Sequence, residues 1–356
     1  MKRILLVLQG EGRGHQTQAL AFTELARQKG YEIVGAVVST PDGNTLPSLL
    51  AEQATFPIFP IASPGLGYTQ SHRLSLSKTF LQTLLGAPKL VRSLDQLHRI
   101  FLSQKPTWVI NFYEPLWGIY AGLFRPKVFT TAIAHQYLLL DPKFPFPPRR
   151  TFEKWVVQAF TRLTAYRADE LWGLSFTPLT TTVPRLKIVP PLLRQIIRLS
   201  HPTTGRYWLA YFTQPAYVQE LIAWSRKNPS QPIHLFGALP PAAPLPKQLQ
   251  WHPISGKHFL EKLVGCEALI TTAGFESIAE AHFLGKPVYA IPLPGHYEQA
   301  CNASDWARTG GGLSGDRLLL DGFQTWLNNR VPSTQAPWVM ADLTFWNSPK
   351  EKTIRR

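Results

Sequence analysis

A run of five aliphatic residues at positions 4–8 leads directly into a glycine-rich turn, and this pairing constrains the fold more than any other feature. A strand that is apolar at every position must be buried on both faces, which is typical of a parallel sheet covered by helices. The turn contains Gly10, Gly12 and Gly14, and residues 19–26 then repeat apolar side chains at helical spacing. The chain therefore opens with a strand, a turn and a helix of an α/β fold.

Further strand-like segments recur along the chain, with helical stretches between them. Strands are expected at residues 31–38, 107–112, 128–134, 207–212, 233–236, 269–272 and 288–291, and helices at 217–225 and 277–284. Alternation of this kind predicts parallel sheets. Because 356 residues are too many for a single core, we expect two α/β domains with parallel sheets that face each other.

The proline-rich region near residue 190 marks the expected division between the domains. We assign residues 1–188 to an N-terminal domain, 189–200 to a linker whose prolines fix local geometry, and 201–333 to a C-terminal domain. The tail at 334–356 is polar and contains two tryptophans. It either crosses back to the first domain or frays, and the sequence leaves both outcomes open.

Basic residues concentrate in the first half of the chain. Residues 1–200 carry 23 Lys and Arg against 11 Asp and Glu, a net charge of +12 out of +15 for the whole chain. Two segments, 72–105 and 143–167, interleave these basic side chains with leucines and aromatic residues. They indicate either packed helices with solvated charges or a surface that rests on an anionic bilayer. Nucleic acid ranks lower as a partner, because the sequence contains no zinc-finger, helix-turn-helix or RNP-like signature.

The cysteine content and the apolar runs favour a cytoplasmic protein. Cys266 and Cys301 are too few for a disulfide framework or a cysteine-rich metal site. The apolar stretch at the N-terminus is too short for a signal peptide. Residues 107–124 contain Asn111 and Glu114, which are costly in hydrocarbon. Any membrane contact is therefore expected to be peripheral, on the inner face of the plasma membrane.

The first glycine-rich turn is a candidate ligand site, since backbone amides between a strand and a helix can approach a ligand closely. Its spacing departs from the dinucleotide-binding fingerprint, because His15 and Gln16 follow Gly14 where a third glycine belongs. An NAD enzyme is therefore disfavoured. The alternative is a tight turn that carries a surface histidine.

A second turn, at residues 271–277, places small residues at the start of a helix. Backbone amides around Gly274 and the hydroxyl of Ser277 can meet a diphosphate at the positive end of the helix dipole. Glu280, one turn further along, can accept both hydroxyls of a ribose. The alternative is that Glu276 and Glu280 form a solvated helix face at i, i+4 spacing.

Glu298 and Gln299 are expected in a loop after the strand at 288–291, where their side chains can bond sugar hydroxyls. Together with the turn before Glu280, they predict a site for a nucleoside diphosphate that carries a sugar.

These features resemble, in order and spacing, the donor-binding region of inverting glycosyltransferases with two Rossmann-like domains, the GT-B fold. The resemblance covers residues 251–312 and is nearest to the lipid-linked N-acetylglucosaminyl transferase of peptidoglycan synthesis and to UDP-glycosyltransferases. It is carried by Trp251 with Pro253, Ala273 with Gly274, Glu280, Gly285 with Pro287, Gln299, Asn302 and the glycines at 310–312. The first half is similar more diffusely, through Gly14, His15 and residues 111–115 and 135–137, to a bacterial and archaeal glycosyltransferase-like group.

The resemblance implies roles for particular residues in nucleotide-sugar binding. Trp251 is implied near the uracil, Glu280 at the ribose, and Glu298 with Gln299 at the transferred sugar. Gly14, Thr272, Gly274, Ser277 and Asn302 complete the implied set, with Gly274 and Ser277 at the diphosphate. Thr272 stands where plant UDP-glycosyltransferases have a histidine that contacts the phosphate, which leaves phosphate handling open.

The implied reaction is an inverting transfer of a hexose from a UDP-sugar to a hydroxyl acceptor, with a lipid or a cell-envelope glycan as a candidate acceptor. No Asp-x-Asp triplet occurs, so no metal is expected, and no cofactor is needed because the nucleotide sugar is a substrate. The alternatives are a non-hydrolysing UDP-sugar epimerase and a non-catalytic nucleotide-sugar-binding subunit.

An inverting transfer needs a base for the acceptor hydroxyl, and His15 is the candidate because it follows the first strand. Glu114, which follows the strand at 107–112, is the first choice for a carboxylate that orients His15, with Asp95 and Glu11 as alternatives. His135 is a second-choice base or an acceptor contact. A binding subunit would need no such base.

Overall fold

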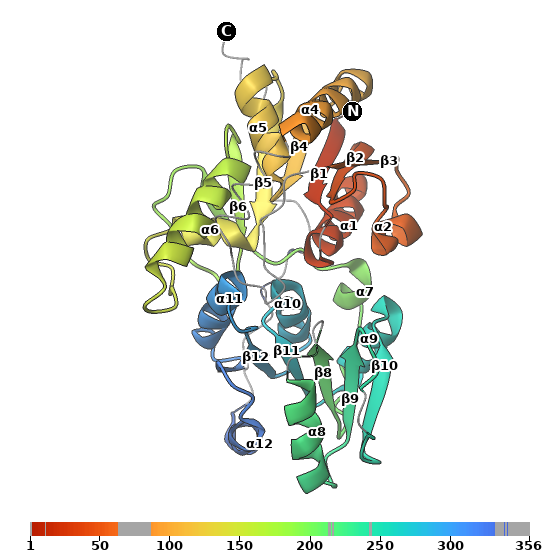
Figure 1. The fold of residues 1–356 in the computed structure, drawn as a ribbon, viewed down its shortest axis with the longest axis vertical. Coiled ribbons are helices and arrows are strands. Elements are labelled where there is room, and N and C mark those ends of the chain that lie inside the picture. The colour runs from red at the N-terminus through yellow and green to blue at the C-terminus, as the bar shows by residue number, and fades with distance from the viewer. Residues whose placement is uncertain are drawn as a thin grey trace. The chain divides into compact units, whose positions relative to one another are not determined.

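The computed structural model describes residues 2–10, 12–62, 87–212, 215, 217–241, 244–331, 338 and 340. Within this part the chain forms two compact α/β units, one containing Met1–Phe144 and Arg150–Gln195 and the other Pro145–Arg149 and Ile196–Trp338 (Figure 1). The expected tail, apart from residues 338 and 340, lies outside the described residues, as do Glu11 and residues 72–86 of the first basic segment.

The first unit is built on a seven-stranded sheet whose neighbouring strands are all parallel. Its order is β3-β2-β1-β4-β5-β6-β7. The strands are β1 (Arg3–Gln9), β2 (Glu32–Thr40), β3 (Ile58–Ala62), β4 (Trp108–Phe112), β5 (Phe129–Ala134), β6 (Glu170–Leu174) and β7 (Leu186–Val189). Residues 4–8 of β1 are completely buried, which confirms that the opening aliphatic run is covered on both faces.

Helices cover the first sheet on its two faces. They are α1 (Gly14–Gln28), α2 (Ser48–Gln53), α4 (Ala87–Gln104), α5 (Pro115–Phe124), the 3₁₀ helix η1 (His135–Leu140) and α6 (Thr151–Thr164). Apolar side chains of α4 and α5 form one core with β1, β2 and β4. At Gly118 of α5 a Cβ would lie 1.9 Å from the Leu163 carbonyl oxygen, so α5 and α6 pack backbone to backbone. In the described part of the chain, no helix combines the length and the apolar character that a membrane span requires.

The second unit is built on a six-stranded parallel sheet of order β10-β9-β8-β11-β12-β13. Its strands are β8 (Trp208–Phe212), β9 (Ile233–Gly237), β10 (Leu249–Pro253), β11 (Ala268–Thr272), β12 (Val288–Ile291) and β13 (Gly312–Ser314). The helices are α8 (Val218–Lys227), α9 (Gly256–Gly265), α10 (Phe275–Phe283), α11 (Tyr297–Ala307) and α12 (Leu320–Asn329), and the short α7 (Gln195–Arg198) lies at the division between the units. Side chains of α8 and α12 pack on one face of the sheet around Trp208 and Phe323.

Candidate functional site

The turn between β1 and α1 is held closed by one side chain. The side-chain Nε2 of Gln16 donates to the carbonyl oxygens of Gly10, at 3.0 Å, and Gly12, at 2.7 Å. A Cβ at Gly10 would lie 2.3 Å from the Ser39 carbonyl oxygen, so only glycine fits where the turn passes β2. Gly14 then begins α1, and the turn is a fixed element that sets where the next residue lies.

His15 is the second residue of α1 and is half-buried. Its Nδ1 lies 3.4 Å from Oε1 of Gln18, one helical turn further along. Its ring stacks on Tyr113, with 5.8 Å between the ring centroids and 24° between the planes. Because Tyr113 directly follows β4, the structure brings the predicted base next to the carboxyl end of that strand.

Glu114 is almost fully buried, with 1% of its surface exposed, and begins α5 as its N-cap. One carboxylate oxygen accepts from the Leu116 amide at 2.9 Å, and the other accepts from the hydroxyl of Ser39 on β2. The Glu114 amide donates to Oδ1 of Asn111 at 2.9 Å. These contacts fix the carboxylate, while its role in orienting His15 stays a prediction. Asp95, the alternative partner, forms an exposed ion pair with Arg99 on α4.

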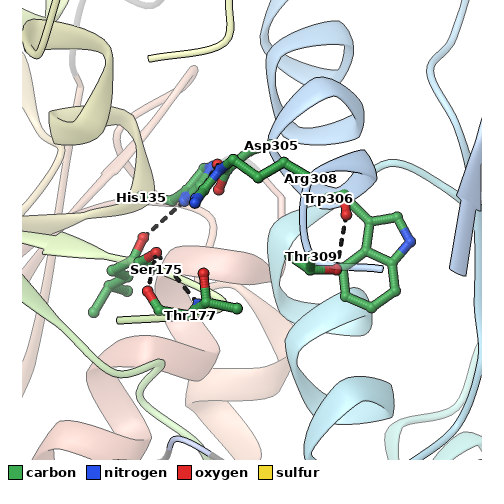
Figure 2. Close-up of polar contacts among 8 residues, drawn as sticks. His135, Ser175, Thr177, Asp305, Trp306, Arg308 and Thr309 are labelled. Atoms are coloured by element: carbon green, nitrogen blue, oxygen red, sulfur yellow. Dashed lines mark hydrogen bonds and ion pairs between the residues drawn. The ribbon is translucent and has the colours of Figure 1, made fainter. Parts of the chain in front are cut away.

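His135 follows β5 and is buried among aromatic rings. Its Nδ1 lies 2.7 Å from the Leu174 carbonyl oxygen, the bond drawn at His135 in Figure 2. Because a carbonyl can only accept, Nδ1 carries the proton, and in the neutral ring Nε2 is then the basic nitrogen. Ser175, next to that carbonyl, donates to the carbonyl oxygen of Thr177 at 2.8 Å.

In the second unit, the turn between β11 and α10 presents the positive end of a helix. Gly274 is the N-cap of α10, in an extended conformation, and as a glycine it has no side chain with which to cap the helix. The Ser277 hydroxyl donates to the Gly274 carbonyl oxygen at 3.2 Å and lies 3.4 Å from the hydroxyl of Thr271. Thr272, at the end of β11, is buried. The start of α10 is the positive end of the helix dipole, which favours an anion.

Glu280 lies on α10 with only 3% of its surface exposed. This burial excludes the solvated-face interpretation for Glu280, since a carboxylate is rarely buried without a function or a partner. Trp251 lies on the edge strand β10 and packs, half-buried, against the core shared with α8 and α12. Its indole nitrogen would lie 3.4 Å from a Cβ placed at Gly237, where β9 ends.

The expectation that Glu298 and Gln299 lie in a loop is wrong, because both belong to the first turn of α11. The helix begins at Tyr297, because the side chain of the N-cap His296 accepts a hydrogen bond at Nδ1 from the Gln299 backbone amide, at 3.4 Å. Oε1 of Gln299 accepts in turn from the Leu293 amide at 2.8 Å. Gln299 therefore holds the loop that leads from β12 into α11.

Asn302 is buried on α11, and its Nδ2 donates to the Ala273 carbonyl oxygen at 2.9 Å. The contact ties α11 to the turn that precedes α10. Seven of the predicted donor residues thus lie at the end of β11 or in the segments that follow β11 and its neighbour β12: Thr272, Gly274, Ser277, Glu280, Glu298, Gln299 and Asn302.

Sequence reasoning missed an ion pair at the other end of α11. Both Nε and Nη2 of Arg308 donate to one carboxylate oxygen of Asp305, at 2.8 and 2.5 Å, and Asp305 is completely buried (Figure 2). Thr309 donates to the Trp306 carbonyl oxygen at 2.8 Å in the same turn. The i, i+3 spacing of Asp305 and Arg308 was the available signal. Among the described residues, no three His, Cys, Asp or Glu side chains form a group that could hold a metal ion.

Three imidazoles meet where β9, β10 and α9 pack together. Nδ1 of His234 lies 2.8 Å from Nε2 of His252, and the His252 ring meets His258 edge to face. Burial, with lesser contributions from Lys262 and the other two imidazoles, lowers the pKa of His234 to about 4. Burial and then the charges of His258 and Lys262 also lower the pKa of His252. This edge of the sheet therefore resists protonation.

Comparison with known families decides the class of protein. The model of glycosyl transferase family 1 matches residues 2–332, nearly the whole chain. The chain belongs to this family. It is therefore a glycosyltransferase, and membership favours sugar transfer over the epimerase and binding-subunit alternatives.

Solved structures of glycosyltransferases share the fold of this family member, and the two parallel-sheet units correspond to GT-B. MurG of Acinetobacter baumannii is 16% identical, with a TM-score of 0.58 over 92% of this chain and 91% of that one. UGT2 of Phytolacca americana, complexed with UDP-2-fluoro-glucose and pterostilbene, is 12% identical, with a TM-score of 0.61 over 89% and 86%. A Polygonum tinctorium UDP-glucosyltransferase is 15% identical, with a TM-score of 0.62 over 91% and 86%. A search of curated proteins found no match.

Proposed function

We propose that this glycosyltransferase moves a hexose from a UDP-sugar to a hydroxyl acceptor, with inversion and without a metal. The observation that supports the proposal most strongly is the turn before α10, where the positive end of the helix lies about one turn ahead of the buried carboxylate of Glu280. This spacing suits a nucleoside diphosphate, because the diphosphate can lie at the helix start while the attached ribose lies near the carboxylate one turn further along.

The diphosphate would lie at the amides that follow Gly274. A negative group at a helix N-terminus gains roughly 0.3–2 kcal/mol from the helix dipole. The Ser277 hydroxyl can turn from the Gly274 carbonyl to a phosphate oxygen, and Thr272 offers a second hydroxyl at the end of β11. Helix amides and hydroxyls would then carry the charge of the departing UDP in place of a metal ion.

The ribose, the uracil and the hexose of the donor would be bound by side chains on β10, α10 and α11. The Glu280 carboxylate is proposed to accept from both ribose hydroxyls, and Trp251 is proposed to lie by the uracil. Glu298 and Gln299 begin α11 and would bond the transferred hexose. Because Oε1 of Gln299 already accepts from the Leu293 amide, its Nε2 is the atom we assign to a sugar hydroxyl.

His15 is the proposed base of the transfer. When Nδ1 donates to Oε1 of Gln18, the lone pair of the neutral ring is on Nε2. Nε2 would take the proton of the acceptor hydroxyl as its oxygen bonds to the anomeric carbon and the bond to UDP breaks. Glu114 is proposed to orient His15, and His135 remains the second choice as base or acceptor contact.

Calorimetric titration with UDP, TDP and GDP tests the donor assignment. We expect UDP to bind most tightly, with unchanged affinity in EDTA, and Glu280→Ala to weaken it at least tenfold. The surface variant Glu261→Gln on α9 is the control. Loss of UDP binding in EDTA would contradict the metal-free assignment, and equal affinity of all three nucleotides would contradict the choice of uridine.

We also propose a cytoplasmic enzyme that binds the anionic inner face of a membrane and uses an acceptor on a lipid or a cell-envelope glycan. Residues 87–167, which include α4, α5 and α6, contain 12 Lys and Arg against four Asp and Glu. Large apolar side chains are exposed on the same helices, among them Trp155 at 63% and Leu123 at 67%. Each basic residue near an anionic bilayer contributes about 1 kcal/mol.

Flotation with vesicles that contain phosphatidylglycerol tests this membrane contact. We expect binding at low salt that falls at high salt, and weaker binding after Trp155→Ala with Phe152→Ala. The control is Leu239→Ala, since Leu239 is 78% exposed but belongs to the second unit. Absence of salt-sensitive binding to these vesicles would favour a soluble acceptor.

A further inference from the structure

Tyr113 adopts a backbone conformation that a side chain disfavours. It directly follows β4 with a φ of 59°, in the left-handed region that glycine occupies without cost. It is nevertheless a large aromatic residue, and it is almost fully buried. A non-glycine residue held in such a conformation beside a candidate site suggests a functional reason for its side chain.

The Tyr113 ring is fixed from several directions. Phe160 and Tyr137 meet it edge to face, at centroid distances of 5.4 and 5.9 Å. Its hydroxyl lies 2.8 Å from Oγ1 of Thr161 on α6. The Thr161 hydroxyl already donates its proton to the Val157 carbonyl oxygen, so the Tyr113 hydroxyl is the donor.

The backbone on either side of Tyr113 is equally constrained. Asn111 accepts from the Glu114 amide and donates to the Glu114 carbonyl oxygen at 3.1 Å, which closes the chain around Tyr113. The same Nδ2 donates to the Thr164 carbonyl oxygen at 2.9 Å, which ties the turn to α6. The ring therefore has one position, and the face it offers is the one on which His15 stacks.

We propose, building on the assignment of His15 as the base, that Tyr113 is a positioning residue that sets the orientation of the His15 imidazole. The stacked ring restricts rotation about the Cβ–Cγ bond of His15, and Gln18 lies by Nδ1. Together they direct Nε2 to one place, where the acceptor hydroxyl must be bound. Catalysis depends on such placement, because a shift of about 1 Å in a reacting group can cost a hundredfold in rate.

Kinetics of two substitutions separate this role from simple packing. Tyr113→Phe keeps the ring and loses only the bond to Thr161, so we expect kcat within about threefold of the parent protein. Tyr113→Leu removes the stacking face, and we expect kcat to fall about 10- to 100-fold with KM for the donor unchanged. Tyr166→Leu, at an exposed tyrosine just after α6, is the matched control. A Tyr113→Leu enzyme with unchanged kcat, or with a higher donor KM as its only defect, would overturn the proposal.

The NMR signals of the His15 imidazole give a readout that does not depend on catalysis. We expect the carbon-bound ring protons of His15 to shift in Tyr113→Leu, where the ring current is lost, and to change little in Tyr113→Phe. Unchanged signals in Tyr113→Leu would show that the stacking is absent. If the signals shift but His15→Ala retains full turnover, the assignment of the base fails while the contact stands. Should Tyr113→Leu not fold, Thr161→Val loosens the same ring from α6, and we expect smaller changes in the same signals.

Discussion

The side-chain amide of Asn302 on α11 donates to the carbonyl oxygen of Ala273, 2.9 Å away in the turn that precedes α10. Asn302 belongs to the motif that resembles a donor-binding region, but in this structure its side-chain amide is hydrogen-bonded to the protein backbone. We expect Asn302 to influence donor binding through the shape of the turn at Gly274, so that its removal affects stability and donor affinity together.

We expect Asn302→Ala to destabilise the protein by about 1–3 kcal/mol, because it leaves the buried carbonyl of Ala273 without its donor. UDP affinity should fall about tenfold as the turn relaxes. Thermal unfolding and calorimetry measure the two effects. Asn329→Ala is the matched control, since its Nδ2 makes a bond of the same length to the Thr325 carbonyl oxygen at an exposed helix end. If Asn302→Ala is destabilised but binds UDP with unchanged affinity, the turn that Asn302 holds is not part of the donor site.

Glu280→Gln is expected to reduce discrimination between UDP and 2′-deoxy-UDP. A carboxylate accepts from both ribose hydroxyls, whereas a glutamine amide presents one acceptor and one donor. We expect the parent protein to prefer UDP by about tenfold and the variant by less than threefold, as one charged hydrogen bond is worth about 1.5–3 kcal/mol. Competition titrations measure both ratios. A preference that survives in Glu280→Gln would place the ribose elsewhere.

His15→Ala should lower kcat by two to four powers of ten, which is the range of general base catalysis, and leave UDP affinity unchanged. Single-turnover transfer assays and calorimetry provide the two measurements. The exposed His201→Ala serves as the control and should match the parent protein. If His15→Ala keeps its turnover and His135→Ala loses it, the base is His135.

Acid should destabilise the second unit between pH 6.5 and 4. The unfolded chain protonates His234 near its ordinary pKa of 6.5, whereas the folded protein holds this pKa at about 4. The unfolded state thus binds more protons across this window, so stability falls as the pH falls. Since His234 is partly exposed, we expect a loss of about 1 kcal/mol. His234→Gln should flatten the dependence of Tm on pH in this window, and His201→Gln should not.

The strands that the sequence predicted are those with continuous apolar runs. The strand expected at 288–291 is β12 with the same bounds, and the run at 4–8 lies within β1. Others were missed for identifiable reasons. β10 is an edge strand with polar residues and a proline, and β13 has only three residues, so neither shows a pattern of burial.

The site was predictable where its residues are close in sequence. Gly274, Ser277 and Glu280 follow one another at intervals of three residues, and the spacing placed all three on α10 or at its start. Contacts between distant segments left no such signal. The hydrogen bond from Ser39 to Glu114 joins residues 75 positions apart, and the stacking of Tyr113 on His15 depends on the neighbouring strands β1 and β4.

Helix α6, which packs closely on α5, connects an exposed surface residue with the surroundings of His15. Its outer face carries Trp155, while Thr161 holds the ring on which His15 stacks. At Gly118 the backbone of α5 lies directly against that of α6, so α6 cannot move toward α5 unless α5 moves as well. If α6 contacts a bilayer through Trp155 as proposed, we expect interfacial activation, with turnover on a water-soluble acceptor rising when vesicles are added.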